Sequence, residues 1–209
     1  DLAKALQAEK KAVIQEEALR QEERGADALD VNVSCQGIDR AKAIRFAVEA
    51  IREVSGLPLV LDDRDFGIIE AGLEKAGRKA WINSPIDSLA IESRRYTFLR
   101  EFRGSVFILP LKGKEVPKTT RDHLEAARRI LKQLQENGIS QDRIVVDAVL
   151  FALKQEKGKV LETLDRIRRL REELGVSTVI GLSNISYGLR NREELNARFL
   201  KLAAASGLD

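Results

Sequence analysis

The sequence predicts an α/β fold in which helices cover a parallel β-sheet. Two features of the 209 residues support this prediction. Short runs rich in Val, Ile and Leu, without polar alternation, are typical of strands buried on both faces of a parallel sheet. These runs alternate regularly with longer stretches of helical character. Such an order indicates either a doubly wound sheet or a closed barrel.

The predicted elements follow one another in a simple order. A charged stretch over residues 1–24, with apolar residues at loose helical spacing and Gly25 after it, predicts one helix. Strands are then expected at residues 28–33, 58–62, 79–83, 105–110, 143–147 and 177–183. A helix should follow each strand: over about 39–55, through 68–77, over about 88–102, from Thr119 or Thr120 as N-cap, up to about Leu174, and over about 191–206.

The ends of the sheet favour the barrel over the open sheet. No G-x-G-x-x-G motif follows the first predicted strand, so a dinucleotide-binding sheet lacks its best marker. Open parallel strands would expose two unpaired edges, which is unfavourable. A (β/α)8 barrel needs eight units, so we expect flanking strands outside the sequence, or another cover for those edges. The chain begins with Asp and contains no Met. We therefore expect one domain over residues 1–209, incomplete at both ends.

Composition narrows the classes of function. The 36 Lys and Arg residues nearly balance the 33 Asp and Glu residues, which predicts no nucleic-acid partner. The single Cys cannot form an internal disulfide, in agreement with a reducing compartment. No stretch approaches the roughly 18 apolar residues of a membrane span, and no signal peptide opens the chain. We expect a cytoplasmic protein without a membrane partner.

Carboxylates and amides mark the carboxyl ends of five predicted strands. They are Asp30 and Asn32, Asp62 and Asp63, Asn83, Asp147, and Ser183 with Asn184. Barrel sites lie at this face and draw residues from several strands, so we expect these side chains to line one pocket. The alternative is that they cap the helices that follow. Carboxylates accept and amides both donate and accept. Such a set suits a flat heterocycle with a guanidine-like edge.

A metal site is not predicted, because His123 and Cys35 are the main candidates for soft ligands. His123 falls in the first turn of a predicted helix, where a surface imidazole is the favoured interpretation. Cys35 follows a strand end, and a role as ligand or nucleophile is the less favoured interpretation.

Two clusters of positive charge do not by themselves indicate a phosphate or RNA partner. The Arg-rich segment 165–174 carries interleaved acidic residues, so we expect a solvated, ion-paired outer face. Lys112, Lys114 and Lys118 lie in one loop. They could meet an acidic tail or partner, or keep the loop soluble, and the sequence favours neither.

Several segments resemble methyltetrahydrofolate:corrinoid methyltransferases. ERGADALDVNV, PLVLDD, EAGLEKAGRKAWINS, KGKEVPK and VIGLSNISYGL stand in the family's order and nearly its spacing, from about Ala18 to Asp209. That family includes the enzyme for the corrinoid/iron–sulfur protein and the folate domain of cobalamin-dependent methionine synthase. Dihydropteroate synthase is a more distant relative. The resemblance implies a TIM (β/α)8 barrel of the pterin-binding type, with its first and last strands outside this sequence.

The resemblance also implies roles for the strand-end residues. Asp62, Asn83 and Asp147 correspond to residues that hold the pyrimidine edge of the pterin. Asn184 corresponds to the catalytic amide that reaches the methyl-bearing N5 nitrogen. The implied substrate-binding set is completed by Asp30, Asn32 and Ser183, and no metal is implied.

The implied reaction moves the N5-methyl group of methyltetrahydrofolate to cobalt(I) of a corrinoid carried by a partner protein. A homodimer is compatible with this reaction. Asp63 stands where the family commonly has Ser, and Ala148 where it commonly has Pro. These departures favour an alternative, a folate-binding module with weakened catalysis. A dihydropteroate synthase-like enzyme is less favoured, because Ser183 and Asn184 stand where a Lys is expected.

Overall fold

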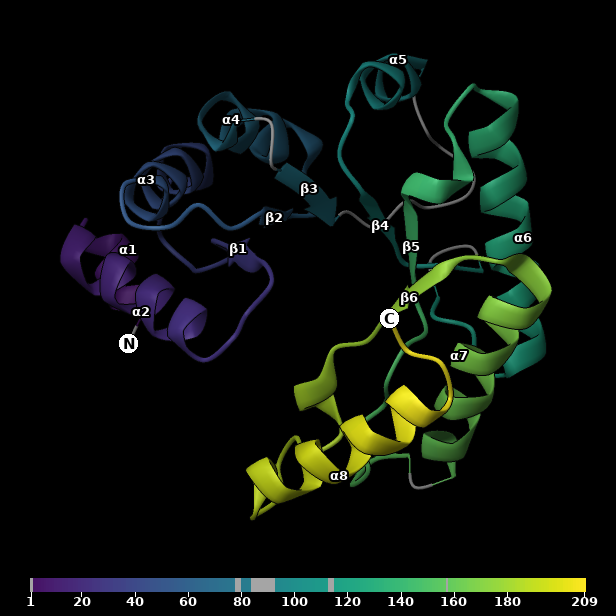
Figure 1. The fold of residues 1–209 in the computed structure, drawn as a ribbon. Helices are drawn as coiled ribbons and strands as arrows, with labels where there is room; N and C mark the ends of the chain where they lie inside the picture. The colour runs from purple at the N-terminus through teal and green to yellow at the C-terminus, as the bar shows by residue number, and fades with distance from the viewer. Residues whose placement is uncertain (1, 78–79, 84–92, 113–114, 157) are drawn as a thin grey trace. The chain divides into compact units, whose positions relative to one another are not determined.

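The computed structural model describes residues 2–77, 80–83, 93–112, 115–156 and 158–209. Its strands are β1 (Leu29–Asn32), β2 (Leu59–Asp62), β3 (Ala80–Asn83), β4 (Val106–Ile108), β5 (Ile144–Asp147) and β6 (Ser177–Val179). Its α-helices are α1 (Leu2–Gln7), α2 (Lys11–Glu23), α3 (Arg40–Arg52), α4 (Phe66–Ala76), α5 (Ser93–Glu101), α6 (Thr120–Glu136), α7 (Lys159–Leu174) and α8 (Arg192–Ala205). Two 3₁₀ turns are η1 (Gln141–Arg143) and η2 (Leu182–Asn184). Figure 1 shows the alternation of strands and helices.

The strand order is the chain order, β1-β2-β3-β4-β5-β6, and the α/β prediction is confirmed. The pairs β1–β2, β2–β3 and β5–β6 are parallel. The chain divides into two compact units, Asp1–Ser84 with Gly104–Val106, and Pro85–Arg103 with Phe107–Asp209.

The first unit places helices α3 and α4 against strands β1 and β2 (Figure 1). Alternating residues of β1, Leu29 and Val31, are buried, whereas Asp30 and Asn32 face the other way. Gly72 lets α4 approach closely, because a Cβ atom there would lie 3.0 Å from Leu61 Cδ1. The core of this unit therefore lies between the strands and the two helices.

The second unit pairs β5 with β6 and packs α6 against α7 (Figure 1). The Thr119 side chain accepts a hydrogen bond from the Asp122 amide and caps α6, as predicted. A stripe of α6 at helical spacing is buried, including Leu124, Ile130 and Leu134.

The structure corrects two predicted elements. The helix expected over residues 1–24 is two helices, because Glu9 adopts a left-handed conformation (φ 48°) between α1 and α2. The strand expected over 177–183 ends at Val179, and the chain then turns into η2, where the Asn184 backbone amide donates to the Gly181 carbonyl at 3.0 Å. The start of the helix expected over 88–102 lies outside the described residues. In the part of the chain that the structure describes, no helix combines the length and apolar character needed to cross a bilayer.

Candidate functional site

Three polar residues form a row across the first unit. Asn32, Asp62 and Asn83 are the last residues of β1, β2 and β3, and the parallel register places Asn32 beside Asp62 and Asp62 beside Asn83. The Asn32 amide nitrogen Nδ2 donates to Asp62 Oδ2 at 2.9 Å. Asp62 and Asn83 are both half-buried. The row therefore presents a carboxylate between two amides at the carboxyl ends of the strands.

Asp30 lies on the same face of β1 as Asn32, two residues earlier. The residue is exposed, yet its surroundings include a cavity of about 100 Å³ lined by apolar side chains such as Leu6 and Ile14. Protein around the carboxyl removes water, and with the nearby charge of Asp62 this raises the pKa of Asp30 to about 7. Near neutral pH, Asp30 is therefore divided between its protonated and ionised forms.

Asp63, the residue that departs from the family pattern, is fully occupied by structural contacts. Its side chain has no exposed surface and accepts from Arg40 Nη1 at 2.7 and 2.9 Å. Its Oδ1 also accepts from the backbone amide of Asp65 at 2.8 Å. The second carboxylate beside Asp62 is thus neutralised by α3 and does not add an unpaired charge to the row.

Asp147, the last residue of β5, is held by a local turn. The Val149 amide donates to Asp147 Oδ1 at 2.8 Å, and Oδ2 makes no hydrogen bond within the described residues. Burial raises the pKa of Asp147 to about 6, against the opposing effects of the Val149 amide and the Arg166 charge. One carboxylate oxygen is therefore fixed and the other is available.

Asn184 lies in η2, five residues beyond the end of β6, and is exposed. It lines a cavity of about 330 Å³ together with residues of the segment after β5, among them Phe151, and with Tyr187. A Cβ atom on Gly181 would lie 2.9 Å from Asn184 Nδ2, so glycine leaves the space that the amide occupies. The Asn184 side chain makes no hydrogen bond among the described residues. Ser183 is exposed beside it, and its carbonyl accepts from Arg192 Nη2 at 3.2 Å.

Helix capping does not account for four of the strand-end residues. The residues at the N-cap positions are Asp39 for α3, Asp65 for α4, Gly158 for α7 and Asn191 for α8. Asn32, Asp62, Asp147 and Asn184 hold none of these positions. The alternative of capping is therefore wrong for these four residues.

Two predictions about side chains outside the strand ends are wrong. His123 is not a surface residue but is fully buried, and burial together with the charge of Arg166 lowers the pKa of His123 to about 3. The Arg-rich segment is an ion-paired outer face at Arg168 and Arg169, as predicted, but Arg166 is completely buried. Both residues lie on the buried stripes of their helices, so their helical spacing in the sequence is the signal that could have predicted their burial.

The remaining candidates show no constellation of their own. Cys35 is a free, half-buried thiol. Lys112 pairs with Asp122 at 2.9 Å, whereas Lys114 lies outside the described residues. Within the described ranges, no three His, Cys, Asp or Glu side chains gather closely enough to hold a metal ion.

Parallel strands followed by helices, with polar side chains at the carboxyl ends of the strands, are the arrangement in which α/β proteins commonly bind small ligands. The chain belongs to the family of pterin binding enzymes, whose model matches residues 3–209. Its fold is the α/β barrel type of that family.

Relatives and solved structures agree with this assignment. The chain is 31% identical over 198 residues to methionine synthase of Mycobacterium leprae (strain TN), and the match covers 88% of this chain but 16% of that protein. It is 23% identical over 213 residues to methylcorrinoid:tetrahydrofolate methyltransferase of Eubacterium limosum, covering 99% of this chain and 77% of that protein. Dihydropteroate synthase from Xanthomonas albilineans, in complex with 7,8-dihydropteroate, shares the fold with a TM-score of 0.73 and 22% identity, covering 94% of this chain and 76% of that one.

Proposed function

We propose that this chain transfers the N5-methyl group of methyltetrahydrofolate to cobalt(I) of a corrinoid carried by a partner protein. The observation that carries the proposal is the set of carboxylates and amides at the ends of successive strands. The likeness to a methionine synthase and to a methylcorrinoid:tetrahydrofolate methyltransferase supports it. The second name describes methyl transfer in the opposite direction, and a catalyst accelerates both directions of one reaction.

The strand ends suit the pyrimidine edge of a pterin, which presents N–H and NH2 donors. The proposal assigns Asp62, Asn83 and Asp147 to this edge. Asn32 occupies Oδ2 of Asp62, which leaves Oδ1 to accept from the ligand. Asp147 offers Oδ2 in the same way, because Oδ1 is already bound by the Val149 amide. Carboxylates whose other oxygen is fixed accept in a defined direction, which lowers the entropy lost on binding.

The chemistry requires help at N5, because a tertiary amine is a poor leaving group. As the methyl–N5 bond breaks, its electron pair stays on N5, which takes up a proton that comes ultimately from water, while cobalt(I) supplies the electron pair of the new cobalt–carbon bond. In the proposal, the Asn184 amide donates to N5 and stabilises the charge that develops there. The corrinoid is the nucleophile, so the chain needs none of its own.

Two alternative functions have less support. Asp63 favoured the binding module with weakened catalysis, but the Asp63 carboxylate is paired with Arg40. The dihydropteroate synthases share the fold, yet Ser183 and Asn184 follow β6 where the resemblance expects the Lys of a synthase.

A paired substitution tests the proposal. Asn184→Ala should slow single-turnover methyl transfer to a reduced corrinoid protein by about 10²–10³, or roughly 3–4 kcal/mol, with a smaller loss of folate affinity. Asp62→Ala should act mainly on affinity, because a bond to the pyrimidine edge is used in ground and transition states alike. Gly181→Ala should also slow transfer, since its Cβ would displace the Asn184 amide.

The matched control is Gln135→Ala, which removes an exposed carboxamide from α6. Parental transfer by Asn184→Ala would show that Asn184 is only a turn residue. Wild-type protein that binds methyltetrahydrofolate but methylates no reduced corrinoid protein would establish the binding module instead.

A further inference from the structure

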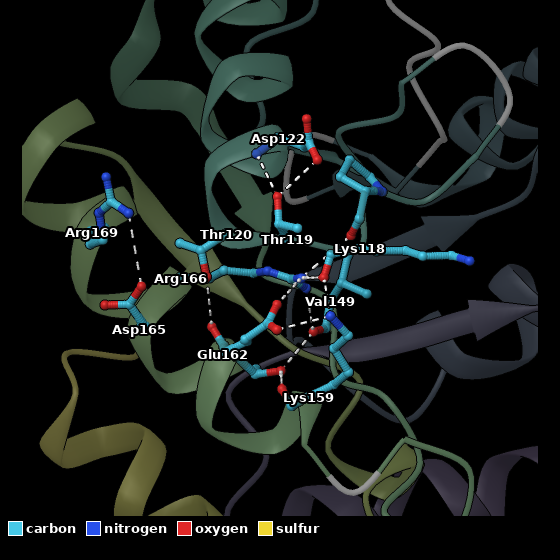
Figure 2. A network of polar contacts seen from close by, with 12 residues as sticks. Lys118, Thr119, Thr120, Asp122, Val149, Lys159, Glu162, Asp165, Arg166 and Arg169 are labelled. Atoms are coloured by element: carbon cyan, nitrogen blue, oxygen red, sulfur yellow. Dashed lines mark hydrogen bonds and ion pairs between the residues drawn. The ribbon is translucent and has the colours of Figure 1, made fainter.

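Arg166 connects two loops from the inside of the second unit. Its side chain, on α7, has no exposed surface. Nη2 donates to the carbonyls of Lys118 at 3.0 Å and Pro117 at 3.3 Å, and Nη1 makes a longer contact of 3.5 Å to the carbonyl of Val149 (Figure 2). The guanidinium thus joins the loop before α6 to the turn after β5.

A buried guanidinium needs a compensating environment, because removing a charge from water is unfavourable. Glu162 Oε2 lies 3.3 Å from Nη2, one helical turn away, and the guanidinium carbon lies 5.5 Å from the centre of the Phe151 ring. The Nε atom nevertheless has no hydrogen-bond partner among the described residues. An apolar side chain would fill a core more simply, so the contacts to the two loops are the distinctive property of Arg166.

The turn that Arg166 contacts is strained. Val149 has φ of 56°, in the left-handed region that a β-branched residue rarely adopts. Its carbonyl accepts from Thr163 Oγ1 at 2.9 Å as well as from Arg166, and its amide donates to Asp147 Oδ1 at 2.8 Å. The peptide group on the amide side of Val149 therefore orients the Asp147 carboxylate, while α7 holds the peptide group on its carbonyl side.

We propose that Arg166 and Thr163 are positioning residues, which hold Val149 in its strained turn and so orient the Asp147 carboxylate for the pterin. The identity of the ligand rests on the function proposed above. The orientation of Asp147 does not, because it follows from the hydrogen bonds within the chain.

The test compares variants of α7 in two measurements. Arg166→Met keeps the apolar stem but loses the donors, and Thr163→Val is nearly isosteric but loses the hydroxyl. Both should bind methyltetrahydrofolate roughly 10-fold more weakly, the scale of one lost buried hydrogen-bond partner. Both should also exchange the Val149 amide hydrogen faster, as read by NMR. Arg169→Met is the matched control, because Arg169 pairs with Asp165 and Glu173 on the outer face.

A second substitution separates positioning from general stability. Glycine adopts the conformation of Val149 without strain, so Val149→Gly should recover part of the affinity lost in Arg166→Met. Should Arg166→Met not fold, Thr163→Val carries the same test.

Wild-type affinity and wild-type Val149 exchange in both α7 variants would overturn the inference, as would the absence of any recovery with Val149→Gly. If wild-type protein does not bind methyltetrahydrofolate, the proposed function fails. The exchange of the Val149 amide then still decides whether α7 holds the turn.

Discussion

Breaking the ion pair between Arg40 and Asp63 should produce an asymmetric loss of stability. Asp63 has no exposed side-chain surface and accepts three hydrogen bonds, two from Arg40 and one from the Asp65 amide. Arg40 is 37% exposed and lies 3.7 Å from the Asp65 carboxylate as well. Removing the arginine leaves a buried charge without its partner, whereas removing the carboxylate leaves an arginine that water can reach.

The contacts set the expected magnitudes. Leaving one partner of a buried pair alone costs about 3–5 kcal/mol, and the partial exposure of Arg40 reduces this to about 2–3 kcal/mol for Arg40→Met. Asp63→Asn keeps an acceptor for the Asp65 amide and loses one charge-assisted bond, so we expect about 1 kcal/mol. Arg45→Met, which breaks the exposed pair between α3 and Glu74 of α4, should cost less than about 1 kcal/mol.

The assay is urea unfolding at pH 7 of the three variants and of the double variant Arg40→Met/Asp63→Asn. The double variant should be more stable than Arg40→Met alone, because it no longer contains the unpaired buried carboxylate. A loss for Arg40→Met no larger than that for Asp63→Asn would refute the reasoning. Folate affinity should be unchanged in Asp63→Asn, since that carboxylate is held away from the row of Asn32, Asp62 and Asn83.

Three further predictions concern pH and capping. The pKa of Asp30 is raised in the folded protein to about 7, so its contribution to stability is full below about pH 4 and is lost as the pH rises through 7. In urea unfolding, Asp30→Asn should therefore stabilise the protein more at pH 8 than at pH 5, and equal effects at both pH values would contradict this. The pKa of Asp147 is raised to about 6, and only its ionised form accepts from a donor at both oxygens. Titrations with methyltetrahydrofolate should therefore show weaker binding at pH 5 than at pH 7.5, and the difference should be smaller in Asp147→Asn. Thr119→Ala removes the cap of α6 and should cost about 1 kcal/mol in thermal or urea unfolding, whereas Arg121→Ala on the same turn should change little.

The sequence predicts the sheet well because its signals are local. Apolar runs end in Asp62, Asn83 and Asp147, and the strands of the structure end at those residues, whereas the strand expected over 28–33 ends one residue earlier, at Asn32. A buried parallel strand needs only a few consecutive apolar side chains, so its end is visible where polarity returns. The prediction fails at the last strand, because the pairing of β6 ends at Val179 while the apolar run continues.

Tertiary contacts account for the predictions that failed elsewhere. His123 and Arg166 are polar by residue type, but their helical spacing places them on buried faces, where Arg166 is paired with backbone carbonyls and Glu162. The pair of Arg40 and Asp63 joins residues 23 positions apart, so no local pattern reveals it. The break at Glu9 has neither Gly nor Pro to mark it, and the helix signal continues across it.

Under the proposed function, the row of Asn32, Asp62 and Asn83 separates the choice of ligand from the stability of the fold. Each occupies the final position of its strand, directly after a buried residue: Val31, Leu61 or Ile82. The buried residues face the helices and maintain the scaffold, and the terminal ones face the opposite side. A combinatorial library at the three terminal positions would therefore sample new specificities on an intact framework. Natural divergence can use the same route, exchanging one strand-end residue at a time while the core stays constant.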